Sequence, residues 1–93
     1  MKLYNTIYHP KGAQTQPTFE VREGNVFTTE HHPDGAYPKA WYELKENKFY
    51  PTDFHPQKAP KNQAWYEIRE NKVYSSEGHP HGSQPMPFFE LRD

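Results

Sequence analysis

The stretch Tyr66-Glu67-Ile68-Arg69-Glu70-Asn71-Lys72-Val73-Tyr74 decides the fold of this chain. Apolar and charged residues alternate along its first half, which is typical of a strand with one buried face. Asn71 then stands where a tight turn needs a residue that tolerates the left-handed backbone region. A two-residue turn sets Ile68 opposite Val73, apolar against apolar. We therefore expect a β-hairpin with one apolar face.

The same phrase occurs four times with a nearly constant period. Its first aromatic residues are Phe19, Tyr42, Tyr66 and Phe89, spaced by 23, 24 and 23 positions. A His-Pro pair recurs with the same period and begins at His9, His32, His55 and His79. A fixed period of this size indicates repeats that are each one supersecondary unit. We expect one domain, residues 1–93, with repeats at about 11–33, 34–56 and 57–80 and a split repeat made of 81–93 and 1–10.

The split repeat predicts a closed ring. Residues 89–93 carry only the first half of the phrase, and residues 2–10 carry only the second half. A lone hairpin is marginal in water, so four apolar faces turned to a common centre would support one another. Pairing of 88–93 with 2–8 would also remove an exposed edge. An open solenoid, or a ring closed by exchange between two chains, is the alternative.

The fold class is therefore all-β, with four hairpin repeats of about 23 residues in a closed pseudo-four-fold ring. The ring is either a miniature propeller-like arrangement or a small barrel. Pro51 lies in an expected second strand and cannot donate to a ladder on both sides. This favours four separate hairpins over a continuous barrel.

Composition indicates a small soluble protein. The chain has 93 residues, a net charge of −1, no cysteine and 16% aromatic residues. The balanced charge offers no basic stripe for nucleic acid, and the lack of cysteine excludes disulfides and thiolate metal sites. Neither an apolar signal region nor a run of membrane-spanning length occurs, so we expect a cytoplasmic protein with no membrane partner. Self-association into a homo-oligomer would bury more of its surface.

The phrase at residues 66–69, followed by a turn and an aromatic strand ending in His-Pro, resembles short tandem repeats of uncharacterised bacterial proteins. The resemblance covers nearly the whole chain. It implies no activity, cofactor or site. MORN and choline-binding repeats have a similar period, but this sequence lacks their Gly-rich signatures.

Four histidines at one phase of the repeat raise the prospect of a metal site. A ring would bring them to equivalent positions, and neutral imidazoles that converge bind zinc or another transition metal. The predicted ligands are His9, His32, His55 and His79. Ile7 in the split repeat stands where the other repeats have a carboxylate, which argues against a strictly four-fold site.

The alternative that we favour is structural. In this interpretation the proline ends the second strand, and the imidazole caps a turn through a hydrogen bond to the backbone. A third interpretation is pH sensing, because six histidines, when all are protonated, take the formal charge from −1 to +5.

Two tryptophans are the candidates for recognition. Trp41 and Trp65 occupy one phase of the repeat, where Thr18 and Phe88 stand in the other copies. Our register turns this position outward, and exposed tryptophan is enriched in binding sites. The alternative is that each ring covers a neighbouring hairpin or packs beneath a long loop. The candidate partner-binding residues are Trp41, Trp65, Tyr50 and Tyr74.

Little in the sequence supports catalysis. The repeated Glu/Arg or Glu/Lys pairs of the first strands alternate charge on a wet face, where they are worth roughly 0 to 1 kcal/mol each. No phosphate loop or dinucleotide fingerprint occurs. We therefore expect a non-enzymatic module that binds a protein, peptide or glycan partner through repeated loop and aromatic sites, with no cofactor. A histidine-based metal protein or small metalloenzyme, and a self-assembling structural protein, are the alternatives.

Overall fold

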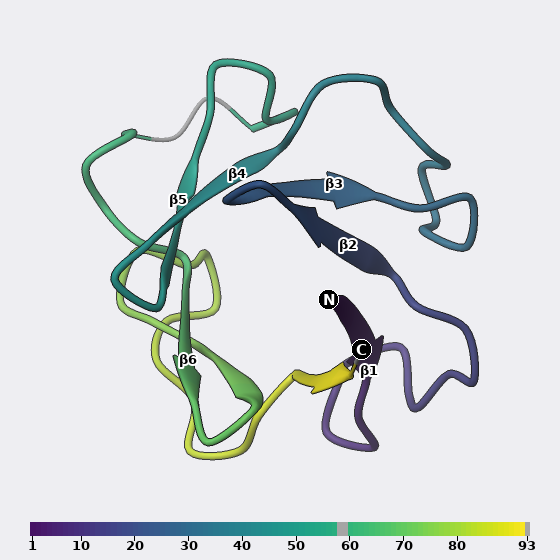
Figure 1. Ribbon diagram of the computed structural model, residues 1–93. Coiled ribbons are helices and arrows are strands. Elements are labelled where there is room, and N and C mark those ends of the chain that lie inside the picture. The colour runs from purple at the N-terminus through teal and green to yellow at the C-terminus, as the bar shows by residue number, and fades with distance from the viewer. Residues whose placement is uncertain (58–59, 93) are drawn as a thin grey trace.

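The computed structural model describes residues 1–57 and 60–92, and its elements are eight four-residue strands. They are β1 (Lys2–Asn5), β2 (Phe19–Arg22), β3 (Asn25–Thr28), β4 (Tyr42–Lys45), β5 (Lys48–Pro51), β6 (Tyr66–Arg69), β7 (Lys72–Ser75) and β8 (Phe89–Arg92). Each strand pairs with the next along the chain, and β8 pairs with β1. The result is the predicted closed all-β ring, seen along its opening in Figure 1.

The hairpins have the predicted two-residue turns. In β6–β7, Ile68 pairs with Val73 and Arg69 with Lys72, which leaves residues 70 and 71 in the turn. Both turn residues have positive φ, 51° at Glu70 and 65° at Asn71. Turns with two left-handed residues match the right-handed twist of the flanking strands. The repeated Glu-Gly or Glu-Asn dipeptide therefore fixes the register of the three contiguous hairpins.

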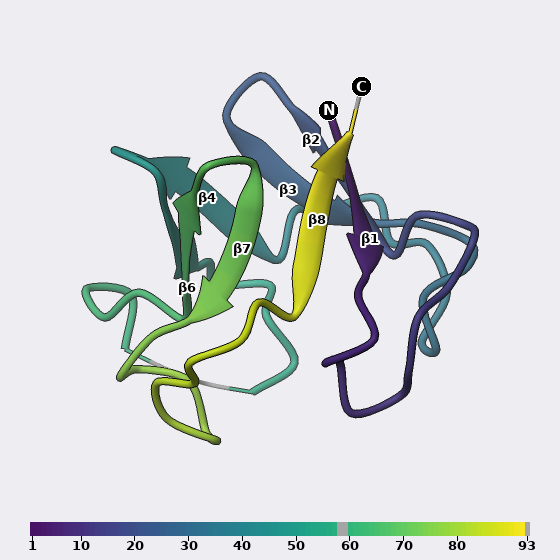
Figure 2. The same ribbon diagram turned by 90° about the horizontal axis from the view of Figure 1, so that it is seen from below.

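The two chain ends complete the fourth hairpin. Lys2 pairs with Arg92 and Asn5 with Phe89, in the register of the three contiguous hairpins. Strands β1 and β8 lie side by side with the N- and C-termini adjacent (Figure 2). The predicted pairing of the split repeat is thus confirmed, and it removes the edge that would otherwise be open.

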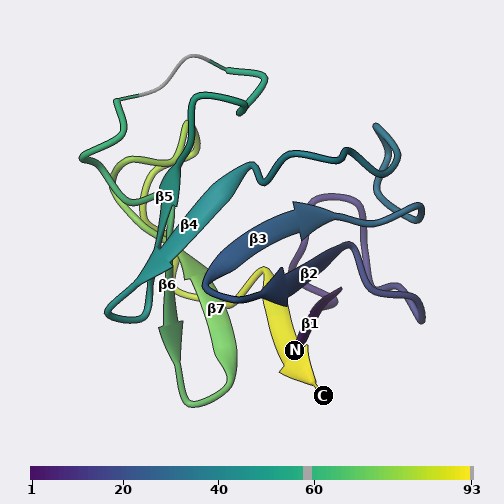
Figure 3. The same cartoon turned by 45° about the horizontal axis from the view of Figure 1, so that its top comes forward.

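The closed ring is a small continuous barrel, so our preference for separate hairpins was wrong. Neighbouring hairpins are also bonded: Phe49 pairs with Tyr66, and Val73 with Phe89. Each hairpin pairs at four positions but each junction between hairpins at only two, so the strands splay toward one end (Figure 3). Pro51 is the last residue of β5, beyond the positions that pair with β6. Its missing N–H therefore interrupts no bond at that junction.

The strands end earlier than expected. Each second strand stops four residues before its histidine, at Asn5, Thr28, Pro51 or Ser75. A turn follows, in which the backbone N–H of the histidine donates to the backbone carbonyl of a hydroxyl-bearing residue three positions earlier, as from His32 to Thr29 at 3.0 Å. The side-chain hydroxyl of that residue donates across the open end of the same hairpin, as from Thr29 Oγ1 to the Pro17 carbonyl at 2.5 Å. The recurring hydroxyl residues of these turns are Thr6, Thr29, Thr52 and Ser76.

The core lies inside the barrel in two layers. Near the turns, the fully buried Leu3, Val26, Phe49 and Val73 are flanked by partly buried aliphatic residues of the first strands. At the opposite end, which we call the loop end, the buried aromatic residues at the start of each first strand form the second layer: Phe19, Tyr42, Tyr66 and Phe89. Alternation along each strand turns every charged residue of the phrase to the outside.

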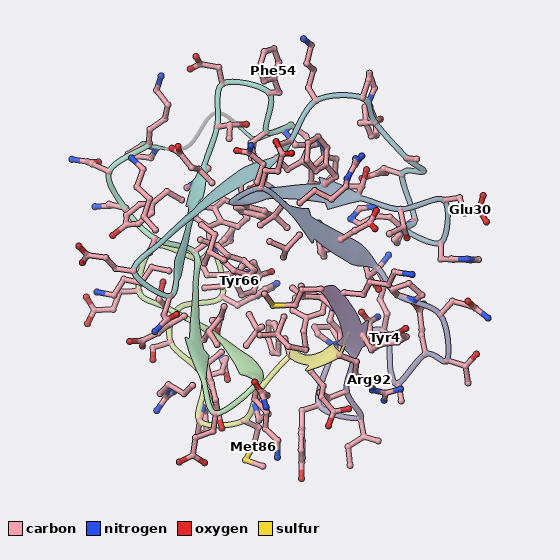
Figure 4. All side chains as sticks on the ribbon, viewed as in Figure 1. Tyr4, Glu30, Phe54, Tyr66, Met86 and Arg92 are labelled. Atoms are coloured by element: carbon pink, nitrogen blue, oxygen red, sulfur yellow. The ribbon has the colours of Figure 1, made fainter. Side chains whose placement is uncertain are left out.

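Ion pairs and stacked cations cover the outer wall. Arg92 Nη2 lies 2.9 Å from Glu90, and Lys45 Nζ lies 3.3 Å from Glu43. The Arg92 guanidinium also lies 4.4 Å from the centre of the Tyr4 ring, and the two side chains are neighbours in Figure 4. Arg69 stacks on Tyr74 in the same way, at 3.9 Å. These exposed contacts add solubility and modest stability.

The part of the chain that the structure describes contains no helix long and apolar enough to cross a membrane.

Deleting residues 88–93 should unfold the protein. The deletion removes β8, exposes the edges of β1 and β7 and takes two buried phenylalanines from the core. Losing a buried phenylalanine costs about 3–5 kcal/mol, and a small domain has only about 5–15 kcal/mol in total. Circular dichroism should show no cooperative melting transition.

The matched control moves residues 88–93 in front of Met1. In that permutant, residues 93 and 1 fill the two turn positions beyond the Lys2–Arg92 pair. It should melt within roughly 5 °C of the native chain. A truncated chain that melts like the full one would contradict the closed barrel.

Candidate binding site at the loop end of the barrel

Four aromatic rings form a pinwheel at the loop end. Neighbouring rings of Phe19, Tyr42, Tyr66 and Phe89 meet edge to face, with centroids 5.5 to 6.0 Å apart. Edge-to-face contact suits the ring quadrupole and adds to the free energy of burial. Tyr66 is seen reaching toward the middle of the ring in Figure 4. The pinwheel is the floor on which the repeated histidines lie.

All four histidines cap a turn in the same way. The N–H two residues further on donates to Nδ1, at 3.0 Å from Lys11 to His9, and again from Asp34 to His32. Equivalent bonds run from Gln57 to His55 and from His81 to His79. An Nδ1 that accepts is unprotonated, so each neutral ring carries its proton on Nε2. At His55 the Gln57 carbonyl also lies 3.0 Å from Nδ1, and we assign the tautomer from the contact that all four share.

Two of the Nε2 atoms have a partner in the pinwheel. His55 Nε2 lies 3.0 Å from the Tyr42 hydroxyl, and His79 Nε2 lies 3.0 Å from the Tyr66 hydroxyl. Burial, with each tyrosine beside the other, raises the pKa of Tyr42 well above its usual range. Burial likewise raises the pKa of Tyr66. Both phenols therefore stay neutral and can accept from Nε2–H.

A second belt of rings surrounds the pinwheel. Trp41 lies between His32 and His55, with centroids 4.8 and 5.5 Å away. Trp65 lies between His55 and His79, at 4.4 and 5.2 Å. Phe88 fills the same place between His79 and His9, at 5.8 and 5.7 Å. Thr18 occupies this phase of the repeat between His9 and His32, so the belt of rings is interrupted there.

A pocket of about 320 Å³ opens at the loop end over these rings. Its lining includes the whole pinwheel, both tryptophans and three of the four repeated histidines, His9, His32 and His55. Exposed polar side chains stand at its rim: Lys11, Asp34 and Gln57. An apolar concave surface with a few polar groups at defined positions is typical of a ligand site. A larger hollow of about 480 Å³ on the outer wall, lined by Lys48, Glu67 and Glu77 among others, is bordered by small and charged side chains.

The histidines resist protonation in the folded protein. Burial, reinforced by the positive charges of Lys11 and His32, lowers the pKa of His9 to about 4. Burial lowers the pKa of His79 to about 4 as well, with the nearby histidines as the smaller cause. Burial also lowers the pKa of His32 and of His55. The Asp34 carboxylate raises the pKa of His32, and the hydrogen bond to the Gln57 backbone raises that of His55, but burial is the larger cause in both. The four imidazoles are therefore neutral at pH 7.

The structure supports the turn-capping interpretation of the repeated histidines. Their Nδ1 atoms are occupied by backbone N–H groups, and two Nε2 atoms by phenols. In residues 1–57 and 60–92, no three His, Cys, Asp or Glu side chains are placed so as to hold a metal ion. The predicted zinc or transition-metal site at His9, His32, His55 and His79 therefore has no preformed ligand set and stays a prediction.

The outward orientation that our register gave the tryptophans was wrong, and the structure agrees with the alternative, in which each ring covers a neighbouring hairpin. Trp41 and Trp65 are each only 6% exposed, because their position precedes the paired strand and folds over the neighbouring hairpin. They line the pocket, together with three of the repeated histidines. Tyr50 and Tyr74 lie half-buried on the outer wall, away from this site. A partner-binding role for these four residues stays a prediction.

The sequence interpretation missed the tyrosines that accept from the histidines. Tyr42 and Tyr66 were treated only as first aromatic residues of the repeated phrase, although Phe19 and Phe89 share their phase and lack the hydroxyl. That difference within one repeat position is the signal that pointed to a polar role. The rim residues Lys11 and Asp34 were not among the predicted site residues.

Comparison with known proteins gives no match: no protein-family model, no curated protein and no solved structure is significantly similar to this chain.

Acid should destabilise the protein between pH 7.5 and 5. The four histidines have lowered pKa values in the folded state, so the unfolded chain binds more protons as the pH falls through 6.5. Their contribution to stability is complete above about pH 7 and is lost toward pH 4. We expect the melting temperature to fall by roughly 5–10 °C from pH 7.5 to 5. The exposed His31 provides a control, since His31→Gln should leave the change of melting temperature with pH as it is in the native chain. A melting temperature of the native chain that does not change between pH 7.5 and 5 would contradict the prediction.

Removing a phenol oxygen from the site should also cost stability. In Tyr42→Phe, His55 Nε2–H loses its acceptor, and we expect a loss of about 1 kcal/mol in urea denaturation. Tyr66→Phe should cost a similar amount, because His79 Nε2–H loses its acceptor. Tyr74→Phe on the outer wall is the matched control and should change stability by less than about 0.5 kcal/mol. Equal effects at the inner and outer positions would argue against the histidine–tyrosine bonds.

Proposed function

We propose that this protein is a non-enzymatic binding module that engages a protein, peptide or glycan partner at the loop end of the barrel. The observation that carries the proposal is the aromatic pocket of about 320 Å³ with charged side chains at its rim. Aromatic surface supplies affinity in such sites, and the few polar groups supply orientation.

The rigidity of the site supports binding over catalysis. Each repeated imidazole is held at Nδ1 by a backbone N–H, and its lowered pKa keeps it neutral, so it acts as a fixed N–H donor at Nε2. A donor that is already oriented loses little conformational entropy when a partner arrives, which favours affinity. A general base at pH 7 would instead need a pKa near the working pH.

The arrangement also supports one central site rather than several equivalent ones. The connections after the strands approach a single pocket, and residues from three of them, Lys11, Asp34 and Gln57, stand at its rim. These rim positions differ in charge, so a partner would meet a cation and an anion on different sides. Such a rim fixes the orientation of the partner more than it adds free energy of binding. For its location, the cytoplasm stays our proposal, because a chain without cysteine needs no oxidising compartment.

Ligand panels test this proposal. Random peptides displayed on phage and an array of glycans are screened against the protein, and the selected ligand is titrated into ¹⁵N-labelled protein. We expect the largest chemical-shift changes at the amides of residues 11, 34 and 57. Asp34→Ala and Lys11→Ala should weaken binding by about tenfold without changing the melting temperature, since both side chains are exposed.

Glu43→Ala on the outer wall is the matched control and should bind like the native chain. Shift changes confined to the outer wall around Tyr50 and Tyr74 would contradict the loop-end site. An absence of any enriched ligand in both panels would count against a binding module of this kind.

A further inference from the structure

The pseudo-four-fold arrangement of rings at the loop end is broken between His9 and His32. Two departures from the repeat coincide there. Thr18 replaces the belt ring that Trp41, Trp65 or Phe88 supplies elsewhere, and Phe19 and Phe89 replace the hydroxyl-bearing Tyr42 and Tyr66. Each departure removes a group, a belt ring or a hydroxyl, that contacts a histidine elsewhere in the ring.

His9 and His32 consequently present N–H donors without a phenol to receive them. His32 packs on Phe19 at 5.1 Å and 69°, almost as His55 packs on Tyr42 at 5.0 Å and 66°. His9 packs on Phe89 at 5.1 Å and 57°. Because Nδ1 is held identically in all four rings, the Nε2–H of His9 and of His32 faces the ring edge where a hydroxyl would stand.

The two donors border the same pocket. His9, Thr18, His32, Phe19 and Phe89 all line it, whereas His79 does not. Phe19 and Phe89 are adjacent in the pinwheel, with centroids 5.5 Å apart, so the two donors face neighbouring corners of it. Thr18 is nearly buried and donates to Asn5 Oδ1 at 2.6 Å, so an occupant would lie over Thr18 and would not displace it.

We propose that the sector between His9 and His32 binds a phenol ring. The ring would lie between the two imidazoles, as Trp41 lies between His32 and His55, and its hydroxyl oxygen would accept from Nε2–H of His9 or His32. The protein itself contains the template for this contact in the bonds from His55 to Tyr42 and from His79 to Tyr66. The inference rests on the proposed function and names the group that the loop end recognises.

Size and charge favour a neutral ring of this kind. A cavity of about 150 Å³ is enough to hold benzene, and the pocket here has about 320 Å³ and an open mouth. The rim carries one cation and one anion, Lys11 and Asp34, so it has no net preference for a charged ligand. The phenol has two natural sources, a small free phenol or the tyrosine side chain of a partner peptide.

Titration with p-cresol tests the proposal directly. We expect saturable shift changes at the amides of residues 9, 18 and 32, with a dissociation constant of about 1 mM or lower. Toluene, which has the ring without the hydroxyl, should bind about tenfold more weakly. Equal binding of the two compounds, shifts located elsewhere, or no saturation by about 10 mM p-cresol would overturn the proposal.

Phe19→Tyr is the decisive variant. It gives His32 the internal acceptor that His55 already has, so p-cresol affinity should fall by about tenfold while the melting temperature rises. Phe89→Tyr would give His9 an internal acceptor in the same way, and it replaces the first variant in the test if that variant does not fold. Phe27→Tyr on the outer wall is the matched control and should leave p-cresol binding unchanged. Unchanged affinity in both inner variants would overturn the proposal.

A short glycine peptide with a central tyrosine, and its phenylalanine counterpart, separate the two sources. Tighter binding of the tyrosine peptide than of p-cresol identifies a partner side chain, and tighter binding of p-cresol identifies a small phenol. A ligand from the panels that occupies the loop end while p-cresol does not bind would overturn the phenol site and leave the binding module standing.

Discussion

Pairing of β1 with β8 is the constraint on which the rest of this structure depends. Eight strands of four residues each bury one face, and a hairpin of that length has too little apolar area to be stable alone. Closure gives every strand two neighbours and turns four apolar faces onto one axis. Only then do Phe19, Tyr42, Tyr66 and Phe89 meet edge to face and form the pinwheel that supports the histidines.

The loop end illustrates how a repeated scaffold yields a single site. The Nδ1 contacts are the same in all four copies and fix the turns after the strands. The Nε2 contacts are not the same, since two histidines are satisfied by tyrosines and two face phenylalanines. The contact that all four copies share is structural, and the one that differs leaves two histidines of the pocket lining, His9 and His32, without a phenol partner. Affinity for a partner would therefore come from the sector that departs from the repeat.

Much of the fold was predictable because it is local. Alternation in residues 66–69 and the dipeptide Glu70-Asn71 define a hairpin with little help from distant residues, and the register followed from Ile68 and Val73. The choice between separate hairpins and a barrel was not local. It depends on bonds such as Phe49 with Tyr66 across a junction, and Pro51 misled because its place at a strand end could not be read from its residue type. The register gave Trp41 an outward orientation for a related reason: Trp41 lies just before a paired strand, where alternation no longer fixes the side chain.

The sequence by itself determined the hairpins, their turns, the order of the repeats and the need for the chain ends to meet, because alternation, turn chemistry and period act over a few residues. It also singled out the four histidines. The tertiary structure alone decided what those histidines do. Whether an imidazole binds a metal, caps a turn or faces a phenol depends on how the loop after each second strand folds back over its own hairpin, which places groups 2 and 13 residues away within 3.0 Å. The distinction between His55, which has its phenol, and His32, which lacks one, is a property of that packing.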